Sequence, residues 1–272
     1  MQISIVAKTI GLLLMVFSFA QVPPLVVDLI YSEGEYLSFV YSFALTILGG
    51  LVLWWPFKEV KKDFRLREGV LIVVCFWIFL SLFGTLPFLI TDSISSLSFS
   101  EAFFESMSGL TTTGATVLSQ LDELPKSILF YRQQLQWLGG MGIIVLAVAV
   151  LPLLGVGGME LYHAESSGIA KDRLTPKLRN TAIALWKIYL SLTVVCALGY
   201  FLSGMSIFDA VSHSFSTVAI GGFSTYDGSI GYFNSAAIET IAMFFMFLAG
   251  INFSLHFVAW NNRSLVDYIK DS

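Results

Sequence analysis

Charged residues are scarce in this sequence: Asp, Glu, Lys and Arg together make up only 12% of its 272 residues. An ordinary soluble domain carries about twice that share of charge. With 56% hydrophobic residues and a mean hydropathy of +0.78, the chain lacks the polar surface that a soluble fold needs. Long charge-free runs place it among membrane proteins instead.

Groups that carry chemistry are also few. The two cysteines, Cys75 and Cys196, lie in the middle of apolar runs, where a thiol is better explained as a small apolar residue than as a disulfide or metal ligand. The sequence contains no Walker loop, dinucleotide fingerprint, HExxH motif or nucleophile elbow. We therefore expect no enzyme activity and no organic cofactor. Its basic loops look like topology signals, so no nucleic-acid partner is expected either.

Six apolar runs are long enough to cross a bilayer, which takes about 20 helical residues. The first follows Lys8 and is expected to end near Pro23 and Pro24, because proline interrupts helices. The predicted spans are Lys8–Asp28, Tyr36–Phe57, Gly69–Ile90, Ile128–Leu154, Ala182–Leu202 and Ala236–Trp260. The fold class expected is an all-α membrane protein.

A short apolar segment with a polar end lies between the third and fourth spans. Phe99–Leu110 reads as a helix too short to cross a membrane, and it runs into the hydroxyl- and glycine-rich segment Ser108–Thr116. Such a layout is typical of a re-entrant pore loop, in which backbone carbonyls replace the water around a cation. Gly114 would supply the positive φ that this backbone requires.

The same pattern occurs a second time, 108 residues later. With that shift and no gaps, Gly114 falls on Gly222 and Ser108 falls on Ser216. The further matches are Glu101 with Asp209, Ala102 with Ala210, Ser106 with Ser214 and Thr116 with Ser224. With two more residues of slip, Leu138–Met141 falls on Leu248–Ile251. The sequence therefore predicts a duplicated unit of span, pore loop and span.

The distribution of basic residues supports this topology. If both loops are re-entrant, 13 of the 15 Lys and Arg residues lie on one side of the membrane, and only Lys126 and Arg132 lie opposite. The positive-inside rule makes the basic side cytoplasmic. We thus expect a multi-pass membrane protein, with both termini cytoplasmic and its two repeats parallel.

The candidate cation ligands are backbone carbonyls of the two loops. They belong to Thr112, Thr113, Gly114, Ile220, Gly221 and Gly222. The alternative is that both loops are external linkers. Glu105 and His213 occupy equivalent positions on the two short helices, and we interpret them as mouth residues in water rather than groups that tune the loops. The run Gly139–Gly142 is either a hinge or a site of close helix packing.

These motifs resemble the Trk/Ktr/HKT potassium transporters. The resemblance rests on Phe103–Thr116, Leu138–Gly142 and Thr217–Ser224, and the two additional N-terminal spans make it strongest to the membrane subunit of bacterial Trk systems. It implies an N-terminal hairpin at residues 1–67 and two repeats at 68–160 and 161–272. It also implies potassium uptake, a homodimer and a cytosolic nucleotide-binding regulatory subunit.

The family has four repeats per chain, whereas this sequence has two, so the resemblance covers the N-terminal half of such a protein. The function expected is passive, channel-like potassium uptake. One alternative is a secondary cation symporter with broken helices, and another is an inactive fragment that needs a partner chain. Proton-coupled flux would favour the first alternative, and flux restored by two further repeats would favour the second.

Overall fold

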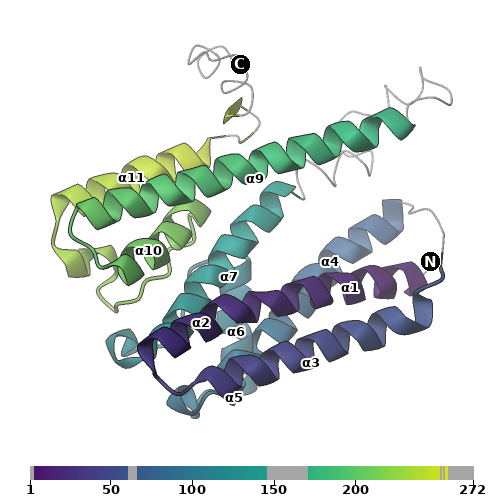
Figure 1. The fold of residues 1–272 in the computed structure, drawn as a ribbon, viewed down its shortest axis with the longest axis horizontal. Helices are drawn as coiled ribbons and strands as arrows, with labels where there is room; N and C mark the ends of the chain where they lie inside the picture. Colours follow the sequence, from purple (N-terminus) through teal and green to yellow (C-terminus); the bar gives the residue numbers. More distant parts are fainter. Residues whose placement is uncertain (1–2, 61–65, 146–170, 252, 254, 257–272) are drawn as a thin grey trace.

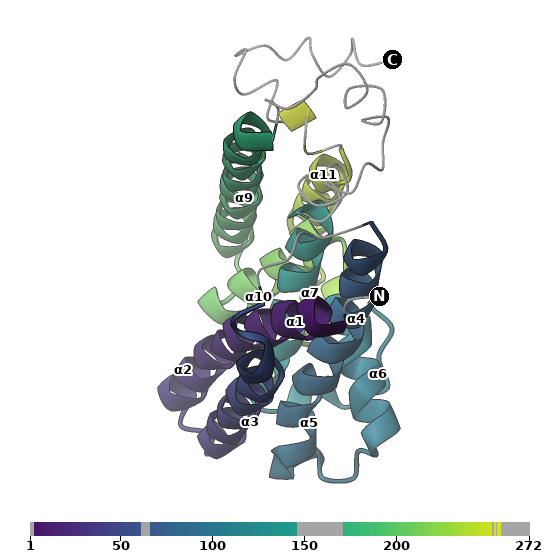
Figure 2. The same ribbon diagram turned by 90° about the vertical axis from the view of Figure 1, so that its right-hand side faces the viewer.

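The computed structural model describes residues 3–60, 66–145, 171–251, 253 and 255–256. Within these ranges every regular element is a helix, as Figure 1 shows. The prediction of an all-α protein is confirmed for the described residues. The helices form an N-terminal hairpin and two later groups that meet at the central helix α7 (Figures 1 and 2).

The N-terminal hairpin consists of one long helical run and a returning helix. Helix α1 (Ile3–Ser18), the turn η1 (Phe19–Gln21) and α2 (Val22–Tyr31) follow one another without a break, and α3 (Tyr36–Trp54) returns beside α1. Helix α3 is followed by the short turn η2 (Trp55–Phe57).

The expectation that the first span ends near its prolines is wrong. Pro23 and Pro24 lie in the first turn of α2, where a missing N–H removes no helical hydrogen bond. The whole run Ile3–Tyr31 is therefore a single apolar stretch of 29 residues. Glycines bring the hairpin together, because a Cβ on Gly11 would lie 2.6 Å from the carbonyl oxygen of Gly50.

The next group contains the first predicted loop. In chain order its elements are α4 (Leu66–Gly84), α5 (Leu86–Ile90), η3 (Asp92–Ile94), α6 (Phe99–Leu110), η4 (Leu121–Glu123) and α7 (Lys126–Val145). Helix α6 has the bounds predicted from the sequence. The hydroxyl of Ser98 accepts from the backbone N–H of Glu101, whose carboxylate accepts from Ser98 N in return, forming a capping box. This cap fixes where α6 begins.

The last group repeats this arrangement. Its elements are α9 (Lys171–Leu202), α10 (Ile207–Ala219), η7 (Ser229–Phe233) and α11 (Ala236–Gly250). Helix α10 begins 108 residues after α6, and Ser206 caps it by accepting from the N–H of Asp209. The two short helices thus begin with equivalent caps at positions that match after the 108-residue shift.

Two predicted spans differ from the helices observed. Helix α11 ends at Gly250, with Ile251 in an extended conformation, so the span predicted for Ala236–Trp260 is interrupted there, and its last residues lie outside the described ranges. The fourth predicted span, Ile128–Leu154, matches α7 up to Val145, and its last residues lie outside the described ranges.

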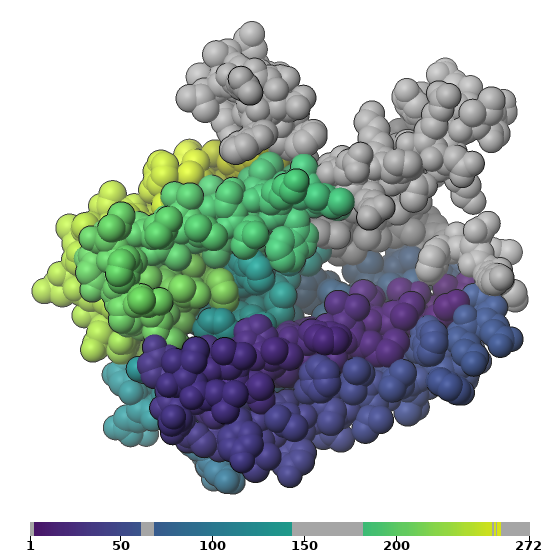
Figure 3. All heavy atoms as spheres, in the orientation of Figure 1, coloured from purple at the N-terminus to yellow at the C-terminus, as the bar shows by residue number. Residues whose placement is uncertain are grey.

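Four helical stretches among the described residues are long and apolar enough to cross a membrane. They are Ile3–Tyr31, Tyr36–Phe57, Glu68–Ile90 and Ala182–Leu202. Leu202 on α9 and Phe247 on α11 are 83% and 71% exposed, as expected of side chains that face lipid. In Figure 3 the surfaces of α9 to α11 and of α1 to α3 form two masses with the teal of α7 between them.

Helix α7 is less apolar than these four stretches because other helices of the protein surround it. It packs against α2, α6 and α10 and carries five buried polar side chains, those of Ser127, Arg132, Gln133, Gln134 and Gln136. A polar residue on a spanning helix is tolerated where it faces other protein rather than lipid. Of these side chains, Arg132 and Gln136 contact the predicted loops, whereas Gln134 donates to the carbonyl oxygen of Ala20 in the N-terminal hairpin.

Candidate functional site

The two predicted loops have the same backbone conformation. In the first, Thr112 and Gly114 have positive φ values of 53° and 75°, and in the second, Ile220 and Gly222 have values of 54° and 84°. Each loop therefore has two left-handed residues separated by one other residue. Ile220 is β-branched, and positive φ at such a residue is an outlier that its surroundings must impose.

The turns that lead from the short helices into the loops are also equivalent. Thr113 N donates to Ser108 O at 2.9 Å, and Gly221 N donates to Ser216 O at 2.8 Å. One residue earlier in each loop, the N–H groups of Thr112 and Ile220 donate to carbonyls three residues back, at 3.0 and 3.1 Å. All four bonds match after the 108-residue shift. The two repeats therefore have the same backbone hydrogen bonds even where their side chains differ.

The structure brings the two loops into backbone contact. A Cβ on Gly114 would lie 1.9 Å from the carbonyl oxygen of Gly221, so only glycine fits there. Gly221 is buried against Gln136, whereas Gly222 is exposed and a Cβ on it would meet nothing within 4 Å. Of the remaining candidates, Thr113 and Ile220 are exposed and Thr112 is half-buried. The six candidate residues thus form two adjoining backbone strips, Thr112–Gly114 and Ile220–Gly222. The open face of the pair is the side on which Thr113, Ile220 and Gly222 are exposed.

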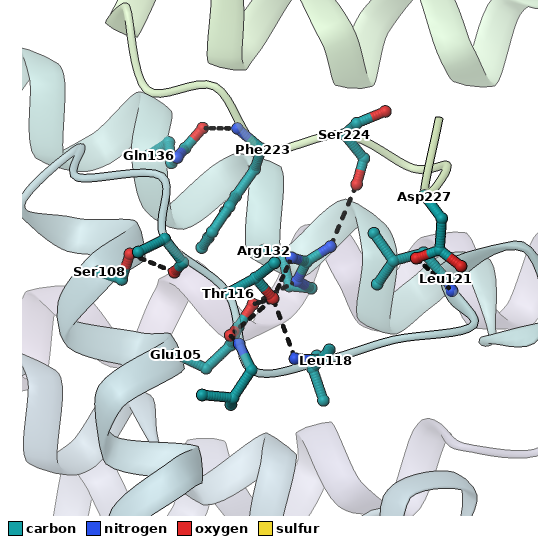
Figure 4. Close-up of polar contacts among 12 residues, drawn as sticks. Glu105, Ser108, Thr116, Leu118, Leu121, Arg132, Gln136, Phe223, Ser224 and Asp227 are labelled. Atoms are coloured by element: carbon teal, nitrogen blue, oxygen red, sulfur yellow. Dashed lines mark hydrogen bonds and ion pairs between the residues drawn. The ribbon is translucent and has the colours of Figure 1, made fainter. Parts of the chain in front are cut away.

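Glu105 is fully buried and holds the first loop. Its carboxylate accepts from the hydroxyl of Thr116 at 2.9 and 3.0 Å and from Val117 N at 3.1 Å, and it pairs with Arg132 Nε at 2.7 Å. Our interpretation of Glu105 as a mouth residue in water is wrong. Its partners lie 11 residues later in the chain and on α7 (Figure 4), so composition alone did not indicate burial.

Arg132 is likewise fully buried, although counting charges had assigned it to the outer surface. It contacts both loops: Nη2 donates to Thr116 Oγ1 at 3.0 Å, and Nη1 donates to the carbonyl oxygen of Ser224 at 3.1 Å. Its guanidinium also lies over the ring of Phe223, 4.4 Å from the centroid. Figure 4 shows this group between the two chain segments. Sequence reasoning missed Arg132 as a site residue.

His213 takes the place of Glu105 in the second repeat. Its exposed fraction is 1%, and its Nε2 is 2.9 Å from Ser224 Oγ, the position that matches Thr116. Its Nδ1 is 2.9 Å from the carbonyl oxygen of Asp209. The interpretation of His213 as a solvated residue is also wrong. Both repeats join the short helix to the loop through a side-chain pair with the same spacing of 11 residues, and this shared spacing was the available signal.

Further contacts support the second loop and its exit. Phe223 N donates to Gln136 Oε1 at 3.1 Å. The Asp209 carboxylate accepts from the hydroxyls of Thr225 and Tyr226 at 3.1 and 3.2 Å. Every one of these side chains binds protein, so their oxygens are occupied in holding the loops.

The Gly139–Gly142 run proves to be a packing site. Helix α7 continues through it without interruption, and a Cβ on Gly139 would lie 1.8 Å from the carbonyl oxygen of Leu110. A Cβ on Gly140 would lie 2.8 Å from the Tyr189 hydroxyl. The structure therefore favours close helix packing over a hinge. These glycines bring α7 against the ends of both short helices.

Side chains that commonly bind metals do not cluster in the described part of the chain. No group of three or more His, Cys, Asp or Glu side chains could hold a metal ion there. Cys75 and Cys196 are free, as expected. Backbone carbonyls are the ligands that suit a dehydrated alkali cation.

These features define an all-helical membrane protein whose internal repeat places two equivalent, glycine-dependent loops side by side. The family model described as "TrkH: Cation transport protein" matches residues 37–267. This chain belongs to the TrkH family of cation transport proteins.

Individual relatives of this chain carry the same family name. The chain is 54% identical over 272 residues to the Trk system potassium uptake protein TrkH of Halomonas elongata, covering 100% of this chain and 56% of that protein. It is 52% identical over 267 residues to the protein of the same name from Escherichia coli K12, covering 98% and 55%.

A solved structure is also similar. The crystal structure of the potassium transporter TrkH from Vibrio parahaemolyticus matches with a TM-score of 0.87 at 50% identity, covering 100% of this chain and 55% of that one. The chain thus spans about half the length of the relatives it matches.

Proposed function

We propose that this chain takes part in potassium uptake across a bacterial inner membrane, with its two loops lining the ion path. The carbonyls proposed as ligands are those of Thr112, Thr113, Gly114, Ile220, Gly221 and Gly222. The relatives that match it over its whole length are potassium uptake proteins by name. A carbonyl path fits their substrate, because such oxygens replace the hydration shell of potassium.

The observation that carries this proposal is the paired backbone of the loops. Positive φ at one residue, negative at the next and positive again turns successive peptide groups to a common side, and both loops have this alternation at matching positions. Gly114 rests against the carbonyl of Gly221, so the two strips adjoin. Two linkers without a shared task would have no reason to keep this conformation, which includes an outlier at Ile220.

We also propose that both loops are re-entrant and that six helices span the membrane. Helices α6 and α10 have 12 and 13 residues, too few for a crossing. With re-entrant loops the basic segments share one side, so the termini are cytoplasmic by the positive-inside rule. Each short helix then directs its C-terminal end, which carries about half a negative charge, toward the ion path. Passive permeation along parallel repeats is consistent with this arrangement.

The assembly proposed follows the resemblance described above. Residues 1–67 form the hairpin, and residues 68–160 and 161–272 form the two repeats. A homodimer in the lipid bilayer and a cytosolic nucleotide-binding regulatory subunit are the partners that we propose. The relatives are named as parts of a Trk system, which is consistent with further components.

Radioactive rubidium uptake tests the function proposed. The protein is produced in bacterial cells that lack other potassium uptake systems, and the wild type is compared with Gly114→Ser at equal amounts in the membrane. We expect the variant to lose about tenfold or more of its uptake, because its side chain meets the Gly221 carbonyl.

The matched control is Gly34→Ser. Gly34 also has a positive φ of 88°, but it lies between α2 and α3 and a Cβ there meets nothing within 4 Å. The control should take up rubidium at the wild-type rate. Absence of uptake by the wild type, or equal rates and selectivity in the wild type and Gly114→Ser, would contradict the proposal.

A further inference from the structure

One buried cation connects the two loops. Arg132 on α7 donates to Thr116 in the first loop and to the Ser224 carbonyl in the second, and it pairs with Glu105 on α6. We propose that Arg132 is a positioning residue that fixes the spacing of the two loops and thereby sets which alkali cation they prefer. This inference rests on the function proposed above.

The geometry requires a guanidinium. Three nitrogens of one planar group point to three different acceptors: Nε to Glu105 Oε1 at 2.7 Å, Nη2 to Thr116 Oγ1 at 3.0 Å and Nη1 to Ser224 O at 3.1 Å. A lysine ammonium is a compact charge on a flexible stem and cannot reproduce this fixed fork. Because the guanidinium is planar and rigid, it holds the two loops at one fixed distance from each other.

The surroundings keep the group in place. Arg132 and Glu105 both have an exposed fraction of 0%, and the ring of Phe223 covers the guanidinium at 4.4 Å. The positive and negative charges compensate each other directly behind the loops. A cation at the open face therefore meets a neutral pair rather than a repelling charge. Burial of the pair also means that its contacts are not exchanged for water.

The second repeat has no equivalent cation. With the slip that aligns Leu138 on Leu248, Arg132 falls on Ala242, and His213 replaces Glu105. One guanidinium thus serves both loops. It reaches the second loop at Ser224, the residue that His213 also holds. Arg132 thus links the loops together with the contact of Gly114 and Gly221 and, at the loop exits, the hydrogen bond from Leu121 N to the Asp227 carboxylate at 3.3 Å.

Spacing matters for ion preference because carbonyl sites discriminate by cavity size or by the number and field strength of their oxygens. A change in the distance between two carbonyl strips alters both quantities. Loss of the Arg132 contacts should therefore change the ratio of rubidium to sodium uptake, not merely its rate. A residue that served folding alone would reduce the amount of protein without altering that ratio.

The experiment compares rubidium and sodium uptake in the same cells for the wild type and Arg132→Lys. Lysine keeps the positive charge beside Glu105 but cannot bind Thr116 and Ser224 together. We expect the rubidium-to-sodium ratio to fall about tenfold at a wild-type amount of membrane protein. An unchanged ratio in Arg132→Lys, with a wild type that takes up rubidium, would overturn this inference while leaving the proposed function intact.

Two further variants keep the test decisive. Lys126→Gln removes another cation of α7, which lies over the ring of Tyr31 and not on the loops, and should retain the wild-type ratio. If Arg132→Lys does not accumulate, the double variant Glu105→Gln, Arg132→Gln removes both charges and should show the same loss of preference. A wild-type ratio in the double variant, or failure of both variants to accumulate, would overturn the proposal in favour of a folding role.

Discussion

Gly114 and Gly221 touch through their backbones: a Cβ on Gly114 would lie 1.9 Å from the carbonyl oxygen of Gly221. The contact joins residues from two repeats that are 107 positions apart in the chain. Two loops in such contact move together, so a distortion of one is transmitted to the other. The second loop has no reciprocal contact at Gly222, where a Cβ would meet nothing within 4 Å.

This asymmetry predicts different outcomes for two equivalent substitutions. Gly222→Ala should cost about 1–2 kcal/mol, because its φ of 84° is unfavourable for a residue with a side chain. Gly114→Ala has the same backbone penalty and, in addition, a clash with a carbonyl that cannot rotate away. Its midpoint of thermal unfolding in detergent should be clearly lower, and its rubidium uptake smaller. Equal midpoints for the two variants would contradict the backbone contact.

A second pair of glycines on α7 tests the packing of this helix against α6. Gly139→Ala would place its Cβ 1.8 Å from the carbonyl oxygen of Leu110, whereas Gly142→Ala meets Trp77 at an ordinary 3.8 Å. We expect the first to lower the melting temperature and rubidium uptake. The second should be neutral or should stabilise the protein by up to about 1 kcal/mol, the helix preference of alanine. If Gly139→Ala behaves like Gly142→Ala, the close approach is absent.

The equivalent caps predict equivalent losses. Ser98→Ala and Ser206→Ala each remove a hydroxyl that accepts from the third residue of a short helix, and each should cost about 1 kcal/mol. Ser235→Ala is the control, because Ser235 precedes α11 without a side-chain capping bond. Denaturation of the purified variants in detergent measures the three costs. A loss at Ser235 as large as the other two would argue against the caps.

Glu35, between α2 and α3, predicts a pH dependence. Burial raises the pKa of its carboxyl, but hydrogen bonds from Ser93 and Ser38 outweigh burial, so its pKa lies below the ordinary value of 4.5. The folded state therefore favours the ionised form. Its contribution to stability is present above the unfolded pKa and is lost as the pH falls through the folded pKa.

The measurement is the melting temperature in detergent between about pH 6 and about pH 3. Glu35→Gln should lose less stability than the wild type over this window, because it has no proton to gain there. Glu123→Gln, at an exposed carboxylate of η4, is the comparison and should follow the wild-type curve. Parallel curves for Glu35→Gln and the wild type would show that the carboxylate contributes nothing.

The histidine of the second repeat should not tolerate a charge. His213→Glu would recreate the carboxylate of the first repeat without a guanidinium of its own, since Ala242 stands where a second arginine would be and Arg132 already pairs with Glu105. A buried, unpaired carboxylate costs about 3–5 kcal/mol, so we expect poor accumulation and a much lower melting temperature. His213→Gln, which can still bond to Ser224, should be milder. Similar stabilities of the two variants would contradict the burial of this site.

The repeat and its local conformations were predictable because they depend on short stretches of sequence. Ser98 and Ser206 signal helix starts by their capping positions, and Gly114 and Gly222 signal positive φ by lacking a side chain. These features require no knowledge of distant segments. The 108-residue offset followed from matches such as Gly114 with Gly222, and the bounds of α6 followed from the apolar segment Phe99–Leu110.

The polar interior was not predictable in the same way. The charge count placed Arg132 only on the side opposite the basic loops, because its acceptors, Thr116 and Ser224, belong to segments 16 residues before it and 92 residues after it. Glu105 and His213 were misjudged for the same reason. Burial of a charge depends on a partner brought by tertiary packing, and one sequence gives no measure of that distance.

The single guanidinium that reaches across both repeats has a consequence for how the two halves evolved. Arg132 binds the second loop as well as the first, and the second repeat has Ala242 where the matching cation would be and His213 where the first repeat has an acid. The halves have become complementary rather than interchangeable. A recombinant gene that copied either half over the other would yield two guanidiniums or none, so gene conversion between these sister segments should be selected against.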